Sequence, residues 1–153
     1  STYTILRNDE TFLSLRFETT LNAGGSGQFS RCFTLDKQTG QVLSLADLFV
    51  EDAAYIPVIS EEILRQMTEQ VEAGLADYFI PGGIWSEEEC FQEIQADQNF
   101  YINDQNQLVI VFDEYEVAPG SAGMPEFVIP YEVLDGILQL PSLIGAQEGE
   151  GLV

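Results

Sequence analysis

The chain has 153 residues, of which 45% are hydrophobic and 11% aromatic, and this suffices for one folded domain with its own core. Twenty-six acidic residues stand against five basic residues and no histidine, so the formal net charge is −21. Nucleic acids and anionic membranes are excluded as partners, because binding them needs clustered lysine and arginine. The lack of histidine excludes Ser-His-Asp and Cys-His catalysis, and also zinc sites with imidazole ligands.

Two interpretations of the acidity remain open at this point. The excess of carboxylates can serve solvation alone, or part of it can be complementary to a basic partner or to Ca²⁺. No cofactor is expected. Nowhere is there an apolar run long enough to span a bilayer.

Alternation of apolar and polar residues predicts strands over Thr2–Arg7, Thr11–Thr20 and Gln28–Leu35. In the second of these strands the odd-numbered positions from Leu13 to Phe17 are apolar and the even-numbered positions are polar. Short turns join the segments, which predicts antiparallel pairing.

Helices are predicted in the middle of the chain. Ser44 caps a short helix that ends near Phe49, and the main helix runs from Pro57 to Gly74. A further helix is predicted over Ser86–Ala96.

The main helix has an apolar stripe with spacings of three and four residues, which is typical of a core-facing helix. The stripe consists of Ile56, Ile59, Ile63, Met67 and Val71. Glu61, Glu62, Glu69 and Glu72 are expected away from it, with Glu61 positioned for an ion pair with Arg65 one turn later.

The last third of the chain predicts a hairpin of Asn99–Ile102 with Gln107–Phe112 and a further strand over Tyr115–Ala118. An extended segment over Pro125–Pro130 and a helical turn in Tyr131–Leu138 follow. With one long helix among these strands, the fold class expected is α+β, an antiparallel sheet with one long helix and shorter helices packed against it. Residues 1–140 are expected to form one domain, and 141–153 a loose tail.

No catalytic machinery is recognisable, and the chain is therefore expected not to be an enzyme. A pair of carboxylates could serve a glycosidase, but among twenty-six acids some pair always has a suitable spacing. Asp113, Glu114 and Glu116 are interpreted as a solvated face rather than as a calcium site. Cys32 and Cys90 could form a disulfide worth roughly 4 kcal/mol, or remain as free buried thiols.

The loop around Ala118–Gly123 is the segment that most suggests a binding site, because loops held on a rigid scaffold carry binding more often than sheets do. A plain connection between two strands is the alternative. The ligand-binding residues predicted here are Tyr115, Glu116, Pro119, Gly120 and Ser121.

An ordered set of short motifs resembles a bacterial domain of unknown function that is shared by RsiV-type anti-sigma factors and PdaC-type peptidoglycan deacetylases. The motifs are Phe33-Thr34-Leu35-Asp36 through Gly40, Leu45-Ala46-Asp47-Leu48-Phe49, Phe100-Tyr101-Ile102, Leu108–Phe112, Tyr115-Glu116-Val117-Ala118-Pro119, Gly123 and Ile129-Pro130-Tyr131. Together they span about Leu13 to Leu134.

This resemblance implies an α+β module outside the cytoplasm at the bacterial cell surface, anchored or secreted with the rest of its protein. In the RsiV-type proteins this part senses lysozyme, a basic protein, so the resemblance implies a cationic protein or a cell-envelope component as ligand. Two alternatives stay open: an accessory domain of a peptidoglycan-modifying enzyme, and a calcium-stabilised structural module.

Overall fold

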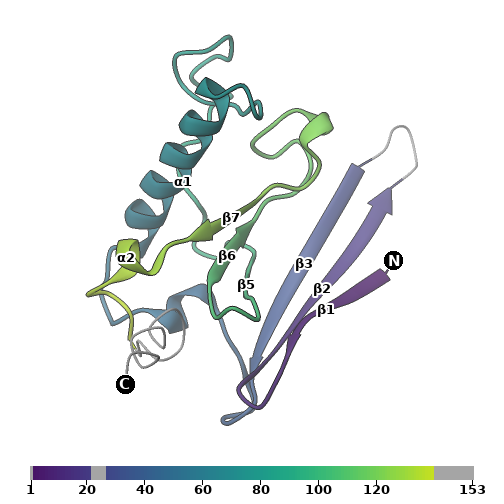
Figure 1. Cartoon of the computed structure of the whole chain (residues 1–153), viewed down its shortest axis with the longest axis vertical. Coiled ribbons are helices and arrows are strands. Elements are labelled where there is room, and N and C mark those ends of the chain that lie inside the picture. The colour runs from purple at the N-terminus through teal and green to yellow at the C-terminus, as the bar shows by residue number, and fades with distance from the viewer. Residues whose placement is uncertain (1, 22–26, 140–153) are drawn as a thin grey trace.

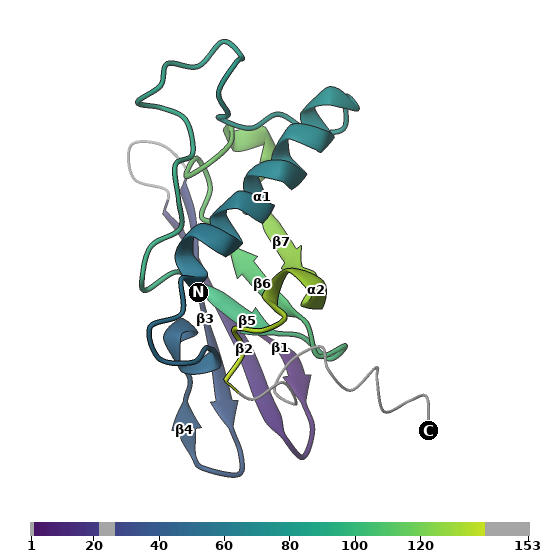
Figure 2. The same cartoon turned by 90° about the vertical axis from the view of Figure 1, so that its left-hand side faces the viewer.

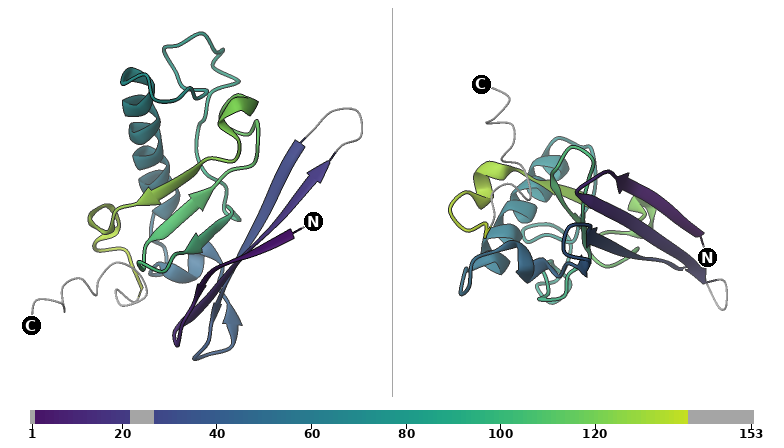
Figure 3. Two further views of the ribbon diagram at one scale, coloured as in Figure 1. Left: turned by 45° about the vertical axis from the view of Figure 1, so that its right-hand side comes forward. Right: turned by 90° about the horizontal axis from the view of Figure 1, so that it is seen from below.

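The computed structural model describes residues 2–21 and 27–139 of the chain, so that the tail expected over 141–153 lies outside the described residues. Three layers follow one another from right to left in Figure 1: a four-stranded sheet, a three-stranded sheet and a long helix. The same layers separate in the further views of Figure 3. This arrangement confirms the α+β class, with two antiparallel sheets where one was expected.

The first sheet has the strand order β1-β2-β3-β4, and the second has the order β5-β6-β7. The strands are β1 (Thr2–Asn8), β2 (Phe12–Leu21), β3 (Gly27–Asp36), β4 (Gln41–Val42), β5 (Phe100–Ile102), β6 (Leu108–Val111) and β7 (Glu126–Ile129). The helical elements are the 3-10 turn η1 (Leu45–Leu48), α1 (Tyr55–Glu72), the 3-10 turn η2 (Gly120–Ala122) and α2 (Tyr131–Leu134). All predicted strands except Tyr115–Ala118 are therefore present, within a few residues of their expected ends.

The main core lies between α1 and the second sheet, and Figure 2 shows α1 crossing the face of that sheet. The predicted stripe on α1 is confirmed, since Ile59, Ile63 and Met67 have no exposed surface. Alternate residues of β5, β6 and β7 meet the stripe, with Ile102, Leu108 and Ile129 in register across the three strands. Burying each such side chain contributes about 1.5–3 kcal/mol.

Two details of α1 differ from the sequence expectation. The helix begins two residues before Pro57, which its first turn tolerates because an amide at that position needs no helical acceptor. Arg65 pairs with Glu62 and Glu69 and not with Glu61.

Glu62 is only 8% exposed, which contradicts its predicted place away from the stripe. Two parallel hydrogen bonds from Arg65, of 3.0 and 2.9 Å, compensate the buried charge and hold the pKa of Glu62 below its usual range.

The helix predicted over Ser86–Ala96 is wrong. The local capping contact exists, because the Ser86 amide donates to the Glu89 carboxylate at 2.9 Å. Further along, however, the Phe91 amide donates to the Phe79 carbonyl and the Ile94 amide to the Ser60 hydroxyl. These tertiary partners replace the helical hydrogen bonds that the local pattern predicts.

The strand predicted over Tyr115–Ala118 is wrong as well. The segment is a turn in which the Glu116 amide donates to the Asp113 carbonyl at 3.1 Å. Tyr115 has φ of +70°, in the left-handed region that no strand residue adopts.

The face of the first sheet that meets the second sheet is largely polar, with Leu6, Phe12 and Cys32 as its non-polar members. Ser14, Ser30 and Thr34 are buried there, and the Ser14 hydroxyl donates to the Ile102 carbonyl of β5 at 2.7 Å. Most apolar residues of the same strands, Phe17 among them, therefore point away from the core, whereas Phe12 at the start of β2 is buried in it.

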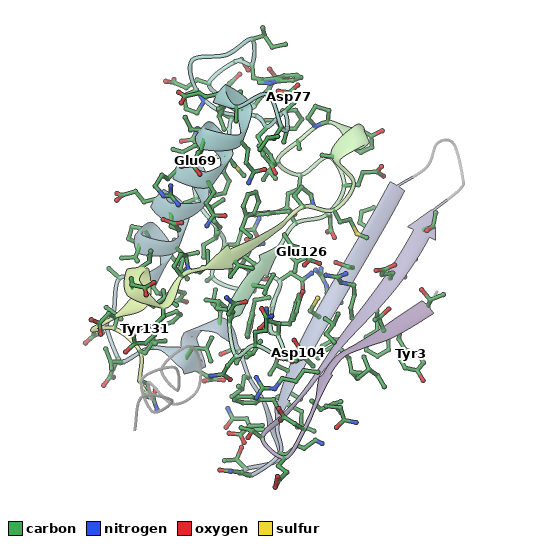
Figure 4. The ribbon with its side chains drawn as sticks, viewed as in Figure 1. Tyr3, Glu69, Asp77, Asp104, Glu126 and Tyr131 are labelled. Carbon is green, nitrogen blue, oxygen red and sulfur yellow. The ribbon has the colours of Figure 1, made fainter. Side chains whose placement is uncertain are left out.

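Charged and amide groups complete this contact between the sheets. Arg16 of β2 forms an ion pair with Glu126 of β7, which also accepts a hydrogen bond from the Tyr101 hydroxyl at 2.9 Å. Figure 4 shows Glu126 between the two sheets, whereas Tyr3 projects from the opposite face of the first sheet. Asn99 accepts from the Cys32 amide at 2.8 Å and donates to the Ser30 carbonyl at 3.1 Å.

Cys32 and Cys90 are free thiols, so of the two alternatives the disulfide is not formed. Cys32 lies on the inner face of β3, where burial raises the pKa of its thiol, whereas Cys90 is buried beside the Trp85 carbonyl.

We expect the replacement Ser14→Ala to destabilise the fold by about 1–3 kcal/mol, because it leaves the Ile102 carbonyl without its buried donor. The matched change Ile5→Ala on the neighbouring strand removes more apolar surface from a half-exposed side chain and should cost less than about 1 kcal/mol. Urea unfolding of both variants measures the difference. Equal costs, or a larger cost for Ile5→Ala, would contradict the polar contact as the determinant of this sheet's orientation.

Candidate functional site

An acidic pocket of 360 Å³ opens between the edge of β3 and the segments on either side of β5 and β6. We call it the acidic pocket; its walls are Phe29, Arg31, Gln95, Asp97, Gln98, Asn99, Val111, Asp113, Glu114, Tyr115 and Glu116. Among the described residues, this lining contains four carboxylates and one guanidinium, that of Arg31. The pocket is thus suited to receive positive charge.

The polar contact between the sheets positions the two walls of the pocket. The Ser30 amide at the edge of β3 donates to the Asp113 carboxylate at 2.9 Å, and the Asn99 side chain binds the same edge. The Asp113 amide in turn donates to the Glu116 carboxylate at 2.9 Å. One chain of hydrogen bonds therefore runs from the first sheet into the turn of residues 113–116.

Tyr115 stands at the rim of the pocket and is 60% exposed. Its ring lies against Gly120, where an added Cβ would come within 2.5 Å of the Tyr115 hydroxyl oxygen. A glycine at position 120 thus leaves room for the ring in this orientation. The contact also joins the turn of residues 113–116 to η2.

The five predicted ligand-binding residues divide between two neighbouring segments. Tyr115 and Glu116 line the acidic pocket, while Pro119, Gly120 and Ser121 follow in the next segment and do not line it. The Tyr115–Gly120 contact connects the two groups. The Ser121 side chain lies outside the described structure. Binding by these residues stays a prediction.

Loss of solvation raises the pKa of Glu116, and the negative charge of Asp113 acts in the same direction. The hydrogen bond from the Asp113 amide and the charge of Arg31 oppose the rise. Ionised Glu116 is therefore short of compensating charge, and an incoming cation would supply it.

A second hollow of 480 Å³ lies beyond the C-terminal end of α1, and we call it the apolar groove. Val71, Tyr78, Ile80, Ile84 and Trp85 line it together with Glu72 and Asp77. The loop that forms it is 88% exposed at Ile84 and 78% at Leu75.

This groove is tied to the turn of residues 113–116 by backbone hydrogen bonds. The Phe79 amide donates to the Val117 carbonyl at 2.8 Å, and Phe79 packs edge-on against Trp85. Figure 1 shows the loop after α1 and the η2 segment at the same, upper end of the molecule. The apolar groove, with its exposed Ile84, is therefore connected to the segment that follows the turn of residues 113–116.

Within the described residues, no group of three or more Asp, Glu or Cys side chains is arranged to hold a metal ion. The calcium-stabilised alternative thus gains no support from the described part of the chain. No helix in that part is long and apolar enough to cross a membrane.

Sequence reasoning missed the pocket walls contributed by Phe29, Arg31 and Asp97. These residues are far apart in the chain, and no local pattern connects them. Asp113 was interpreted as part of a solvated face, although its carboxylate accepts a bond from the β3 edge. Only the packing of the two sheets brings these groups together.

Residues 46–132 match the family described as "Protein of unknown function (DUF3298)". The chain is also similar to the anti-sigma-V factor RsiV of Bacillus subtilis, with 38% identity over 142 residues. The match covers 90% of this chain and 47% of RsiV, so the chain spans about half the length of this curated relative.

Two solved structures of DUF3298 family proteins share the fold. The protein from Pseudomonas aeruginosa gives a TM-score of 0.71 at 18% identity, with 94% of this chain and 62% of that chain covered. The protein from Bacteroides fragilis gives 0.65 at 16% identity, with 96% and 56% covered.

We expect Tyr115→Gly to be more stable than Tyr115→Ala by about 1 kcal/mol, because only glycine adopts the positive φ of this position without steric cost. Both variants remove the same exposed ring, so the comparison isolates the backbone. Chemical denaturation measures the difference. An alanine variant as stable as the glycine variant would show that the turn relaxes out of the left-handed conformation.

Proposed function

Because the chain belongs to the DUF3298 family, and because an acid-lined pocket lies beside an exposed apolar groove, we propose that it is a non-enzymatic sensing domain that binds a basic protein. The proposed ligand is lysozyme or a protein of similar charge. The proposed location is outside the cytoplasm, at the bacterial surface.

The observation that carries the proposal is the charge of the acidic pocket. Asp97, Asp113, Glu114 and Glu116 converge from two separate segments, and Arg31 is the cation in the described lining. A lysine or arginine side chain of a basic protein would compensate the excess negative charge of the pocket. The net charge of −21 adds long-range attraction, which accelerates encounter at low ionic strength.

The apolar groove supplies apolar contact surface, which the charge of the acidic pocket does not provide. Rim charges contribute mainly to association rate, whereas exposed aromatic and apolar side chains anchor an interface. Tyr115, Ile84 and Trp85 are candidates for this role, since Tyr115 stands at the rim of the acidic pocket and Ile84 and Trp85 line the apolar groove.

A sensing role agrees with the similarity to RsiV, whose name describes an anti-sigma factor. This chain spans about half of that protein, so the regulatory output of the whole protein would depend on segments beyond the domain. The role proposed for the domain itself is recognition.

We expect lysozyme to bind saturably in about 0.15 M salt, with an affinity that falls as salt is added, because the ionic contacts are screened. The double replacement Asp97→Asn with Glu116→Gln removes two charges from the acidic pocket and should weaken binding at least about tenfold. Calorimetric titration measures both effects.

The control is the pair Glu10→Gln with Glu132→Gln, which removes the same charge from residues outside the pocket. If the control weakens binding as much as the pocket variant does, net charge and not the pocket determines recognition. No saturable binding by the unmodified chain would overturn lysozyme as the ligand.

The raised pKa of Glu116 gives binding a pH dependence. A bound cation favours the ionised carboxylate and lowers the pKa of Glu116, so complex formation should release protons at a pH between this lowered pKa and the raised pKa of the free domain. Affinity should therefore rise as the pH rises from 4.5, the ordinary pKa of a glutamate, through the raised value in the free domain. Titrations in buffers of different ionisation enthalpy count the protons. Glu116→Gln should flatten this rise of affinity with pH. If the pH dependence of the affinity is unchanged in this variant, the bound cation does not lie beside Glu116.

A further inference from the structure

The outward face of the first sheet is apolar and has no covering layer among the described residues. Its exposed large side chains are Tyr3, Ile5, Phe17, Phe29, Phe33 and Val42. The strand register places these side chains on the same side of the sheet. Tyr3 pairs with Phe17, and Ile5 and Phe33 both pair with Leu15. Val42 pairs with Leu35, which is on the same side of β3 as Phe33. We call this surface the outer face.

Aromatic contacts run across three strands of the outer face. The ring centroids of Tyr3 and Phe17 are 6.1 Å apart, and those of Phe17 and Phe33 are 5.7 Å apart. Exposed apolar surface of this extent on a soluble domain marks an interaction site.

The outer face also differs from the rest of the molecule in charge. The chain has 26 acidic residues, yet the outward positions of β1, β2 and β3 in the described ranges hold no carboxylate. Arg31, at the β3 edge, is the charged residue among them. A basic protein attracted to this domain finds no counter-charge here, in contrast to the acidic pocket.

We infer that the outer face binds a second copy of this chain, related by a twofold axis. Two molecules of charge −21 repel each other, and they approach at least cost where neither presents a carboxylate. A twofold interface is built from the same patch on both partners, and an apolar sheet face satisfies this requirement. Arg31 of one copy then lies near the aromatic rings of the other, which attract a guanidinium.

The dimensions of the face set the strength of this association. β2 has ten residues, which at about 3.3 Å per residue gives a length of about 33 Å, and neighbouring strands lie about 4.8 Å apart. Three to four strands thus offer an area at the low end of specific interfaces. We therefore expect a weak dimer and not an obligate one.

Salt distinguishes this association from ionic binding. Between about 0.1 and 1 M salt the screening length falls from about 10 to 3 Å, which removes most of the repulsion between the copies. Sedimentation equilibrium of the unmodified chain should therefore show a monomer–dimer equilibrium that shifts toward dimer at the higher salt. A chain that stays monomeric at both salts overturns the inference and leaves the face to another segment or protein, and a dimer that dissociates as salt is added overturns it too.

Two charge insertions test the location of the interface. Phe33→Glu at the centre of the face and Tyr3→Glu on the edge strand each place a carboxylate in the contact and should weaken dimerisation at least about tenfold. Tyr3 is 64% exposed, so its replacement leaves the fold intact even if Phe33→Glu fails to fold. Circular dichroism checks each variant for folding.

The matched control is Ile84→Glu, which adds the same charge at an exposed apolar residue of the apolar groove. Dimerisation should survive it. A dimer unaffected by Tyr3→Glu and Phe33→Glu, or weakened equally by Ile84→Glu, would contradict the outer face as the interface. Because Phe29 and Arg31 belong to both surfaces, the lysozyme titration is repeated with Tyr3→Glu, whose side chain lies outside the acidic pocket. Unchanged lysozyme affinity in this variant keeps the failure of either proposal distinguishable from the failure of the other.

Discussion

The polar contact between the two sheets is the interaction on which the rest of this structure depends. Ser14 donates to a β5 carbonyl, Arg16 pairs with Glu126, and Asn99 binds the backbone of β3. Buried polar groups are costly unless each finds a partner, so this contact specifies one relative position of the sheets. An apolar contact would tolerate sliding; hydrogen bonds between particular atoms do not.

Two surfaces of opposite character follow from this one contact. On the inner side it brings the edge of β3 to the turn of residues 113–116, where Ser30 binds Asp113 and the acidic pocket forms. On the outer side it leaves Phe17 of β2 and Phe29 and Phe33 of β3 exposed. The same strands thus contribute to the acidic pocket and to an apolar face.

Much of the fold could be predicted because it depends on local repetition. The α1 stripe and the alternating strands are properties of consecutive residues, and the structure confirms them. The strand predicted over Tyr115–Ala118 failed because a local turn, closed by Asp113 and Glu116 and with a positive φ at Tyr115, replaces it. The helix predicted over Ser86–Ala96 failed because a tertiary contact outweighs local preference: Ile94 bonds to Ser60 in place of a helical partner. Local patterns hold no information on such partners.

By itself the sequence determined the α+β class, the antiparallel pairing and the net negative charge, since periodicity and composition do not depend on long-range contacts. It also located Tyr115 and Glu116 as candidate site residues. The tertiary structure alone decided that Phe29, Arg31 and Asp97 share a pocket with them, and which face of the first sheet is buried. Alternation defines two faces of a strand, but the hydrogen-bond partners on the opposing sheet determine which of the two faces is buried. In this protein the polar face is buried.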